Sequence, residues 1–548
     1  MFKTSFRILW RNIMKDRQFT MLNLFGLSTG LACTMLIYLW VNDELQVDKF
    51  NEKDKQLFQI MMNMETPNGI ETGEQSPGLL AQALTKELPE VEYATSVITV
   101  SWADKTGILT YQGNHITATN QFAGKDYFNI FSYHFIDGNK TTPLSDKSSI
   151  VISRELAMKI FKTTQNVVGK SIEWNQKEYS GVYRISGIFE NPPVNATIQF
   201  DIAFQYELFL DKNPNLQKWS NNQPATYVIL KPGTDINQFN DKIAGFIKTR
   251  HDKSKATLFA QKFSDRYLQS HYENGLPNGG RIDYVNLFSI TAIFILLIAC
   301  INFMNLSTAK AIRRIREAGI KKILGAQRST LIAQTLGESL LLAFLSTIIA
   351  IGFVFLLLPQ FNLITGKQLS IPFNLNFILT ILSITVIARL DALYKKDNNG
   401  LPFEYRFLDE DYQGLYASEK KVATLSKYFA GLAIIISCLG LFGLAAFTAQ
   451  KRQKEIGIRK VVGASTNNVM ILLSKDFLKL VLISILIAFP ISLWAMYQWL
   501  HGFAYRVDLG IDIFVIAAIS TILITMLSIG FQSLKAAVTN PIKSLRSE

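Results

Sequence analysis

The sequence YVNLFSITAIFILLIACINFMNL, residues 284–306, holds no charged side chain and is followed by the basic segment RRIREAGIKKILGA, residues 313–326. A helix of about 20 apolar residues crosses the hydrocarbon core of a bilayer. Residues 284–306 therefore predict a membrane span. Lys and Arg collect on the cytoplasmic side of membrane proteins, so the basic segment should lie in the cytoplasm.

Other apolar stretches repeat this pattern along the chain. Five further segments are long enough to span a membrane: residues 19–41, 339–358, 428–449, 480–500 and 513–531. We expect Pro359 to stop the third span and Pro490 to kink the fifth. Residues 372–388 form a weaker seventh candidate that Arg389 interrupts.

The composition of the 548-residue chain agrees with a membrane protein, because 49% of the residues are hydrophobic and only 18% are charged. The net charge of +13 is carried beside the apolar segments, which indicates topogenic charge and excludes nucleic acid as the expected partner. Cys33, Cys300 and Cys438 lie within apolar runs, and the five histidines show no ligand spacing. We therefore expect no disulfide framework, metal site or cofactor.

The distribution of basic residues predicts the orientation. Such residues precede the first span, follow 284–306 and 428–449, and fill the C-terminal tail. The N-terminus should then be cytoplasmic, and residues 42–283 should form a soluble domain outside the membrane. This domain should have an α/β fold, with strands at residues 149–153 and 183–189 and helices at residues 79–87 and 154–161.

An internal repeat relates two parts of the membrane region. Residues 313–326 align with KRQKEIGIRKVVGA, residues 451–464, at an offset of 138, and seven of fourteen positions are identical. Each copy follows one span and precedes another. Such repeats are typical of membrane proteins built from two related halves.

Each copy suits a short helix at the cytoplasmic surface, with its basic residues at the headgroups. We expect an inward-facing apolar set in each copy, and Gly325 and Gly463 should end the helices. The expected inward residues are Ile320, Ile323 and Leu324 in the first copy and Ile458, Val461 and Val462 in the second. One interpretation is a topogenic loop that binds lipid only; the other is a shape that docks onto a protein. Repetition of the uncharged glycines favours docking.

The pattern R-x-x-E-x-G-I-x-K-x-x-G-A after a span resembles the MacB/FtsX-like permeases of ABC transporters. Further segments resemble the extracytoplasmic domains of this family: DKF at 48–50, SIVIS at 149–153, SGIFENPP at 186–193 and FEYRFLDEDY at 403–412. The resemblance implies a multi-pass helical protein of the bacterial inner membrane, with six or seven spans and one large α/β extracytoplasmic domain inserted after the first span.

The resemblance also implies that a separate ATPase binds coupling helices at residues 308–326 and 450–464. The coupling residues that it implies are Arg314, Glu317, Gly319 and Gly325 in the first copy and Arg452, Glu455, Gly457 and Gly463 in the second. In this family the membrane part transmits ATP-driven motion to the extracytoplasmic domain.

Catalytic motifs are not found in the sequence. Gly169-Lys170-Ser171 has the end of a P-loop, but Thr164 stands where the first glycine is needed. We therefore interpret the triplet as a turn and expect no ATPase or other enzymatic activity in this chain. Glu338 and Asp476, at equivalent repeat positions before their spans, are expected to pair with basic neighbours.

The predicted organisation comprises five parts: residues 1–41 with the first span, the extracytoplasmic domain 42–283, a first membrane bundle 284–388, residues 389–427 and a second bundle 428–548. Residues 389–427 resemble only the end of a second extracytoplasmic domain. We infer a deletion with its junction near residues 388–390, because seven full crossings would place the second basic repeat outside.

The function that these features predict is that of an ABC permease subunit, coupled to a separate ATPase and working in export or efflux. The alternative is a non-transporting regulator in which the ATPase drives the outer domain to activate an envelope enzyme. Membrane lipids, a periplasmic adaptor and a second permease copy are further candidate partners. A sensor receptor is disfavoured, since the sequence shows no kinase or methyl-accepting domain.

Overall fold

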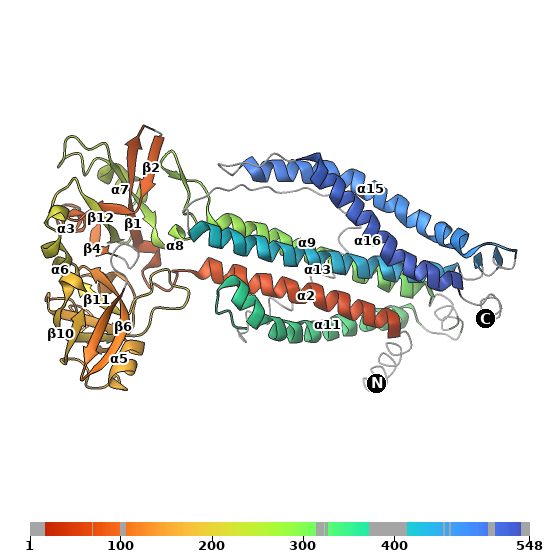
Figure 1. The fold of residues 1–548 in the computed structure, drawn as a ribbon, viewed down its shortest axis with the longest axis horizontal. Helices are drawn as coiled ribbons and strands as arrows, with labels where there is room; N and C mark the ends of the chain where they lie inside the picture. The colour runs from red at the N-terminus through yellow and green to blue at the C-terminus, as the bar shows by residue number, and fades with distance from the viewer. Residues whose placement is uncertain are drawn as a thin grey trace. The chain divides into compact units, whose positions relative to one another are not determined.

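A computed structural model describes residues 17–371 and 414–538, except positions 68, 99–105, 314–319, 321–322, 324–326, 453–454, 457, 460–461 and 502–509. The chain divides into two compact units. One unit comprises residues 43–282, and the other comprises the described residues on either side of that insertion (Figure 1).

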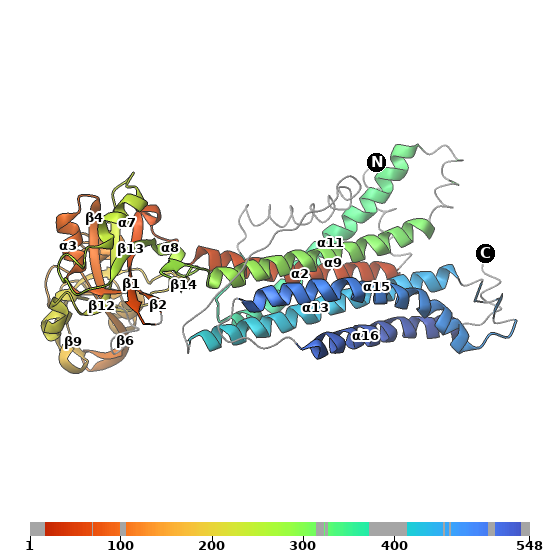
Figure 2. The ribbon, with the colours of Figure 1, turned by 90° about the horizontal axis from the view of Figure 1, so that it is seen from above.

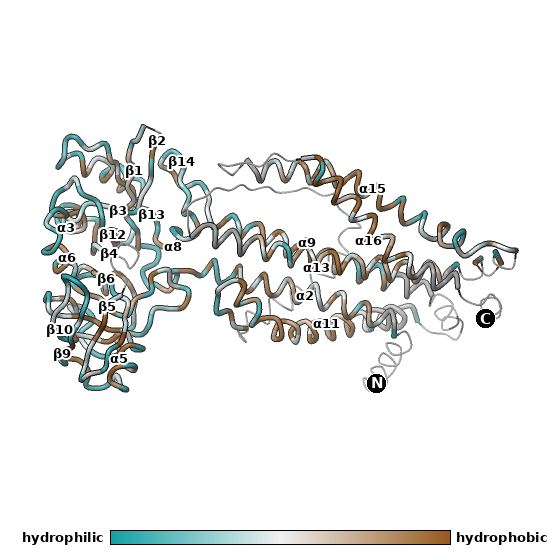
Figure 3. The backbone as a smooth tube through the Cα atoms, in the orientation of Figure 1, coloured by the Kyte–Doolittle hydropathy of each residue, from teal (hydrophilic) through white to brown (hydrophobic). Residues whose placement is uncertain are grey.

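The membrane unit is a bundle of long helices (Figures 1 and 2). The six described helices that are long and apolar enough to span a bilayer are α2 (Arg17–Gln46), α9 (Arg281–Arg313), α11 (Arg328–Thr365), α13 (Gly414–Lys451), α15 (Thr466–His501) and α16 (Ile511–Val538). Their apolar character is visible along α11, α15 and α16 in Figure 3. The six spans expected from the sequence are confirmed, and the seventh candidate, 372–388, lies outside the described residues.

Proline does not end the third span, contrary to expectation. Helix α11 continues through Pro359 to Thr365, and Gly366 then adopts φ +69° and donates its N–H to the Asn362 carbonyl at 2.8 Å. A proline removes only one backbone hydrogen bond, which a membrane helix tolerates. The left-handed glycine ends the helix instead.

Helix α13 begins earlier than the predicted span at 428. Residues 414–427, expected to belong to the end of a second extracytoplasmic domain, are its first turns. The remaining residues of that expected segment, 389–413, lie outside the described part, as does the inferred junction near 388–390.

The inserted unit is an α/β domain around a mixed sheet (Figures 1 and 2). Parallel pairing joins β8 to β10 and β6 to β11, and the other described pairs are antiparallel. The order of the main path is β11 (Ile202–Gln205), β8 (Ser149–Ser153), β10 (Gly181–Phe189), β9 (Ser171–Asn175), β5 (Thr106–Tyr111), β6 (Asn114–Ala123), β4 (Val91–Ile98), β12 (Asn222–Leu230), β1 (Leu57–Thr66) and β13 (Thr257–Lys262).

Smaller elements complete the domain. The strands β2 (Gly69–Gly73), β3 (Gln75–Pro77) and β7 (Phe135–Gly138) join β1, β12 and β10, and β14 (Tyr272–Glu273) pairs with β15 (Leu276–Pro277). The α-helices are α3 (Leu80–Glu87), α4 (Tyr127–Ile130), α5 (Arg154–Phe161), α6 (Tyr206–Lys212), α7 (Ile236–Ala244) and α8 (Phe263–Arg266). The 3₁₀ turns are η1 (Asp54–Gln56), η2 (Lys177–Tyr179) and η3 (Pro214–Gln217). The two strands and two helices expected from the sequence are all present.

Local sequence explains why α5 follows β8 directly. The Ser153 hydroxyl caps the helix by accepting the Leu156 N–H at 3.2 Å. Leu156, Ala157 and Ile160 are buried on one face, as helical spacing requires. The helix ends at Lys162, which has φ +56°.

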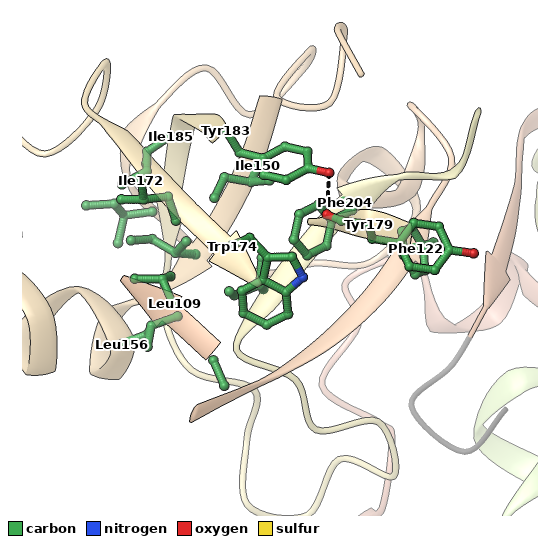
Figure 4. Packing of buried hydrophobic residues seen from close by; sticks show 14 of the residues in the cluster. Leu109, Phe122, Ile150, Leu156, Ile172, Trp174, Tyr179, Tyr183, Ile185 and Phe204 are labelled. Carbon is green, nitrogen blue, oxygen red and sulfur yellow. Dashed lines mark hydrogen bonds between the residues drawn. The ribbon is translucent and has the colours of Figure 1, made fainter. Parts of the chain in front are cut away.

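Aromatic side chains fill the core on which this helix packs. Trp174 is fully buried, its ring centroid lies 5.4 Å from that of Phe204, and its Nε1 donates to Gln176 Oε1 at 3.1 Å. The Tyr183 hydroxyl donates to the Tyr179 carbonyl at 2.8 Å (Figure 4). These contacts give the domain an apolar core of its own.

The first residues after α2 are tied to the domain by a buried carboxylate. Asp48, at φ +59°, accepts from the Thr197 N–H at 2.8 Å and from its hydroxyl at 2.6 Å. Arg266 also donates to that hydroxyl, at 2.9 Å. Burial raises the pKa of Asp48, although the Thr197 bonds oppose this shift.

Candidate coupling site

The second copy of the repeat begins where α13 ends. Arg452 continues the helical hydrogen bonding, since its N–H donates to the Thr448 carbonyl at 3.0 Å. Its guanidinium Nη2 donates to Asp476 Oδ2 at 3.0 Å, and Asp476 lies on the next span, α15. This ion pair joins the start of the second repeat copy to the following helix.

A short helical stretch follows. The Ile456 N–H donates to the Arg452 carbonyl at 2.9 Å, and the Arg459 guanidinium donates to Glu455 Oε1 at 2.8 Å, one helical turn away. Ile456 is buried, and it packs with Ala449, Ala464 and Met470. Among the described residues of this stretch, Ile456 is the buried apolar side chain that packs against the membrane helices.

The segment closes with a glycine cap. Gly463 adopts φ +97°, and the following Ala464 N–H donates to the Arg459 carbonyl at 2.9 Å. This spacing, with a left-handed glycine before the donor, is that of a Schellman motif. The expectation that Gly463 ends a helix is confirmed.

Four of the six apolar residues expected to face inward lie at the surface, and the other two, Leu324 and Val461, lie outside the described residues. The side chains of Ile458 and Val462 are 56% and 82% exposed, and in the first copy Ile320 and Ile323 are 59% and 86% exposed. For these four residues the expectation is wrong, and in the second copy Ile456 is the buried side chain of the turn. Exposed apolar residues beside paired charges form a surface that a partner or the lipid headgroup region could cover.

An open groove of about 640 Å³ adjoins this segment. Its polar end holds Arg452, Glu455 and Asp476, and its walls are apolar residues of α13 and α15, including Phe447 and Phe477. The arrangement can receive a side chain or a lipid. Among the described residues, no group of three metal-ligating side chains is found.

The first copy is described only in part. Arg314, Glu317, Gly319 and Gly325 lie outside the described residues, as does Gly457 of the second copy. Glu338, the equivalent of Asp476, is buried at 6% exposure. The two acids therefore sit in different environments, and Asp476 pairs with Arg452 rather than with its sequence neighbours Lys475 or Lys479.

The turn expected at the P-loop-like triplet is also present. Gly169 has φ +91°, its N–H donates to the Ile185 carbonyl at 2.8 Å, and Lys170 N–H donates to the Val167 carbonyl at 3.2 Å. The last residue of the triplet, Ser171, is the first residue of β9 in the α/β domain.

The close contact of α2 with α9 involves residues that the sequence patterns above did not predict. Gly26 and Gly30 of α2 face Asn302 and Ala299 of α9, and Gly440 of α13 faces Asn302 from the other side. The G-x-x-x-G spacing of Gly26 and Gly30 was a signal that could have identified this contact.

Comparison with known proteins agrees with this architecture. The family described as MacB-like periplasmic core domain matches residues 20–246, and the FtsX-like permease C-terminal family matches residues 289–390 and again 428–541. The second family thus matches once in each half of the repeat. The chain belongs to the MacB/FtsX-like family of ABC-transporter permeases.

Curated relatives share this region at low identity. The macrolide export ATP-binding/permease protein MacB of Salmonella paratyphi A is 21% identical over 353 residues, covering 62% of this permease and 50% of the relative. The MacB protein of Neisseria gonorrhoeae is 20% identical over 363 residues, covering 64% and 52%. The permease spans about half the length of the curated relatives it matches.

Two solved structures are similar to part of the permease. A permease-protein domain from Porphyromonas gingivalis has 22% identity and a TM-score of 0.34, covering 39% of this permease and 93% of that chain. The periplasmic region of MacB from Actinobacillus actinomycetemcomitans has 14% identity and a TM-score of 0.29, covering 39% and 90%.

Proposed function

We propose that this permease couples ATP hydrolysis by a separate ABC ATPase to movement of its extracytoplasmic domain, in the service of export. The observation that carries the proposal is the capped segment between Arg452 and Gly463. It is repeated in sequence, held by one buried isoleucine and one ion pair, and leaves Ile458 and Val462 exposed.

An exposed segment attached to two membrane helices suits the transfer of motion. The segment continues from α13, and the Arg452–Asp476 pair links it to α15. A displacement of the segment by a bound ATPase would therefore act on both helices. The proposed contact residues are Arg314, Glu317, Gly319, Gly325, Arg452, Glu455, Gly457 and Gly463. The curated relatives named above are described as macrolide exporters, which supports export as the direction.

The test is ATP turnover. The purified permease alone should hydrolyse no ATP, and addition of a co-expressed ABC ATPase from the same genome should produce hydrolysis that depends on the reconstituted permease. Hydrolysis by the permease alone, after removal of trace contaminants, would contradict the proposal.

The second part of the proposal is orientation, with the N-terminus in the cytoplasm and the α/β domain outside. Asn139 is exposed on this domain, so an Asn139→Cys variant should react with a membrane-impermeant thiol reagent in intact cells. For this test Cys33, Cys300 and Cys438 are replaced by Ser. Labelling only after lysis would reverse the assigned orientation.

The reconstituted permease and ATPase can also distinguish export from regulation of an envelope enzyme. Transport into or out of vesicles, driven by ATP, supports export. ATP turnover without movement of any substrate, but with activation of a cell-wall hydrolase, supports the regulatory alternative.

A further inference from the structure

Helix α2 packs closely against α9 and α13, and we call the residues of these two helices that it contacts its seat. A Cβ at Gly30 would lie 2.4 Å from Ala299 Cβ on α9, and a Cβ at Gly26 would lie 2.9 Å from Asn302. Thr34 Oγ1 donates to the Ala292 carbonyl at 3.5 Å. These small residues let the backbones of α2 and α9 approach closely in antiparallel directions.

Helices α9 and α13 are equivalent members of the two halves, and they pair with each other. The offset of 138 that relates the basic segments also aligns Cys300 with Cys438 and Asn302 with Gly440. A Cβ at Gly440 would lie 2.7 Å from Asn302 Oδ1, so these two equivalent positions touch. An in-register parallel pair of this kind has an approximate two-fold axis along its length.

This relation can be applied to the residues that hold α2. Four residues in its seat on α9 and α13 are almost fully buried: Phe288 (1%), Ala292 (8%), Ala299 (0%) and Ile436 (0%). Their repeat equivalents are Ser426, Ala430, Ser437 and Ile298. None of these equivalents is buried.

Three of the four equivalents line one groove. A groove of about 280 Å³ between α9 and α13 includes Ser426, Ala430 and Ile298 among its walls. It lies where the two-fold relation would place a second α2. The second half is described from Gly414, the first residue of α13, and residues 372–413 directly ahead of it lie outside the described part.

We propose that this groove is the docking site for a transmembrane helix of a second membrane protein, one with a small-x-x-x-small face like that of Gly26 and Gly30. The groove wall on α13 offers Ser426, Ala430 and Ala433, whose small side chains permit close approach of a helix backbone. A second copy of this chain is a poorer source, because 72% of the apolar window of α2 is already buried in its own seat. The proposal is independent of the ATPase coupling proposed above.

The probe for this site is a synthetic peptide of residues 17–46, the sequence of α2, with Thr34→Cys and Cys33→Ser. In its own seat Thr34 meets Ala292, so in the groove position 34 should meet the equivalent residue, Ala430. The receptor is the full-length chain with its native cysteines replaced by Ser and with Ala430→Cys. The control receptor carries Ile519→Cys, on an exposed position of α16.

Both receptors are reconstituted in phosphatidylcholine–phosphatidylglycerol vesicles with the peptide and mildly oxidised. We expect the Ala430→Cys receptor to form at least about tenfold more cross-linked product than the Ile519→Cys receptor. A peptide with Gly26→Leu and Gly30→Leu should lose this excess, and so should a receptor that adds Ala433→Phe to fill the groove. Equal cross-linking at the two positions would show that lipid fills the groove and would overturn the proposal.

Discussion

The two halves of the membrane unit share a repeat but differ in their surroundings. The apolar windows of α2, α9 and α11 in the first half are 72%, 28% and 22% buried within the chain, against 22%, 11% and 11% for α13, α15 and α16 in the second. The first half also carries the α/β domain between its first two helices. Within the described residues, helices with equivalent sequences therefore differ in how much of their apolar surface the chain itself covers.

The largest expected effect concerns the domain, which belongs to the first half alone. Trp174→Ala should lower the free energy of unfolding of this domain by about 3–5 kcal/mol, because it empties a fully buried site beside Phe204. Hydrogen exchange of the full-length chain should accelerate in β5, β9 and β10. Equal acceleration in α13 and α15 would show that the halves are not separable in stability.

The domain should also respond to alkaline pH in a way that the second half does not. Burial raises the pKa of Tyr179 from 10.0 to about 12. A raised pKa in the folded state stabilises the fold below pH 10, and this contribution is lost as the pH rises towards 12. Tyr179→Phe should weaken this pH dependence, as measured by denaturant titrations at a series of pH values. An unchanged slope would mean that Tyr179 ionises equally well in the folded domain.

The α2 seat offers a matched pair of substitutions. Ala299→Phe should cost about 1–3 kcal/mol, because the larger side chain meets the backbone at Gly30. The same change at the equivalent residue, Ser437→Phe, should stay within about 0.5 kcal/mol, since Ser437 is exposed. Thermal unfolding in detergent compares the two. Similar losses for both would contradict the asymmetry between the halves.

Of the two repeat-equivalent acids, Asp476 should give the smaller change in the free energy of unfolding. The Arg452–Asp476 pair is partly exposed, so Asp476→Ala should cost no more than about 1 kcal/mol. Glu338→Ala at the equivalent buried position should cost more, about 1–3 kcal/mol, because partners of a buried polar group lose their hydrogen bonds. The reverse order would mean that the second-half ion pair is the stronger one.

Sequence patterns predicted the elements well but not the contacts between them. Apolar length identified the six spans, β-rich composition beside turn formers identified β8, and helical spacing after a plausible helix start identified α5. These features depend on neighbours along the chain. The partner of Asp476 is Arg452, 24 residues away, and no local pattern encodes that distance.

The same limit applied to the repeat segment. Its glycine cap followed from Gly463 itself, whereas the inward residue turned out to be Ile456 rather than Ile458. Which side of a short amphipathic helix is covered depends on how the next span packs. That packing is a tertiary property. The segment has apolar residues on more than one side, so its sequence does not show which side is covered.

The central claim, that the segment from Arg452 to Gly463 docks onto an ATPase, is tested most directly by co-purification of that ATPase with variants of this segment. Gly463→Val forces a β-branched residue into φ +97° and should abolish binding, whereas Gly463→Asn, which tolerates this conformation, should retain it. Glu455→Lys should also reduce ATPase binding, because it reverses a charge at the contact surface. Membrane insertion and thermal stability of each variant serve as folding controls. Loss of the ATPase from Gly463→Val and Glu455→Lys, with insertion intact and binding kept in Gly463→Asn, is the predicted result. ATPase binding unchanged in all three variants, with tighter attachment of Glu455→Lys to anionic lipid, would contradict the claim and leave the segment as a lipid-binding loop.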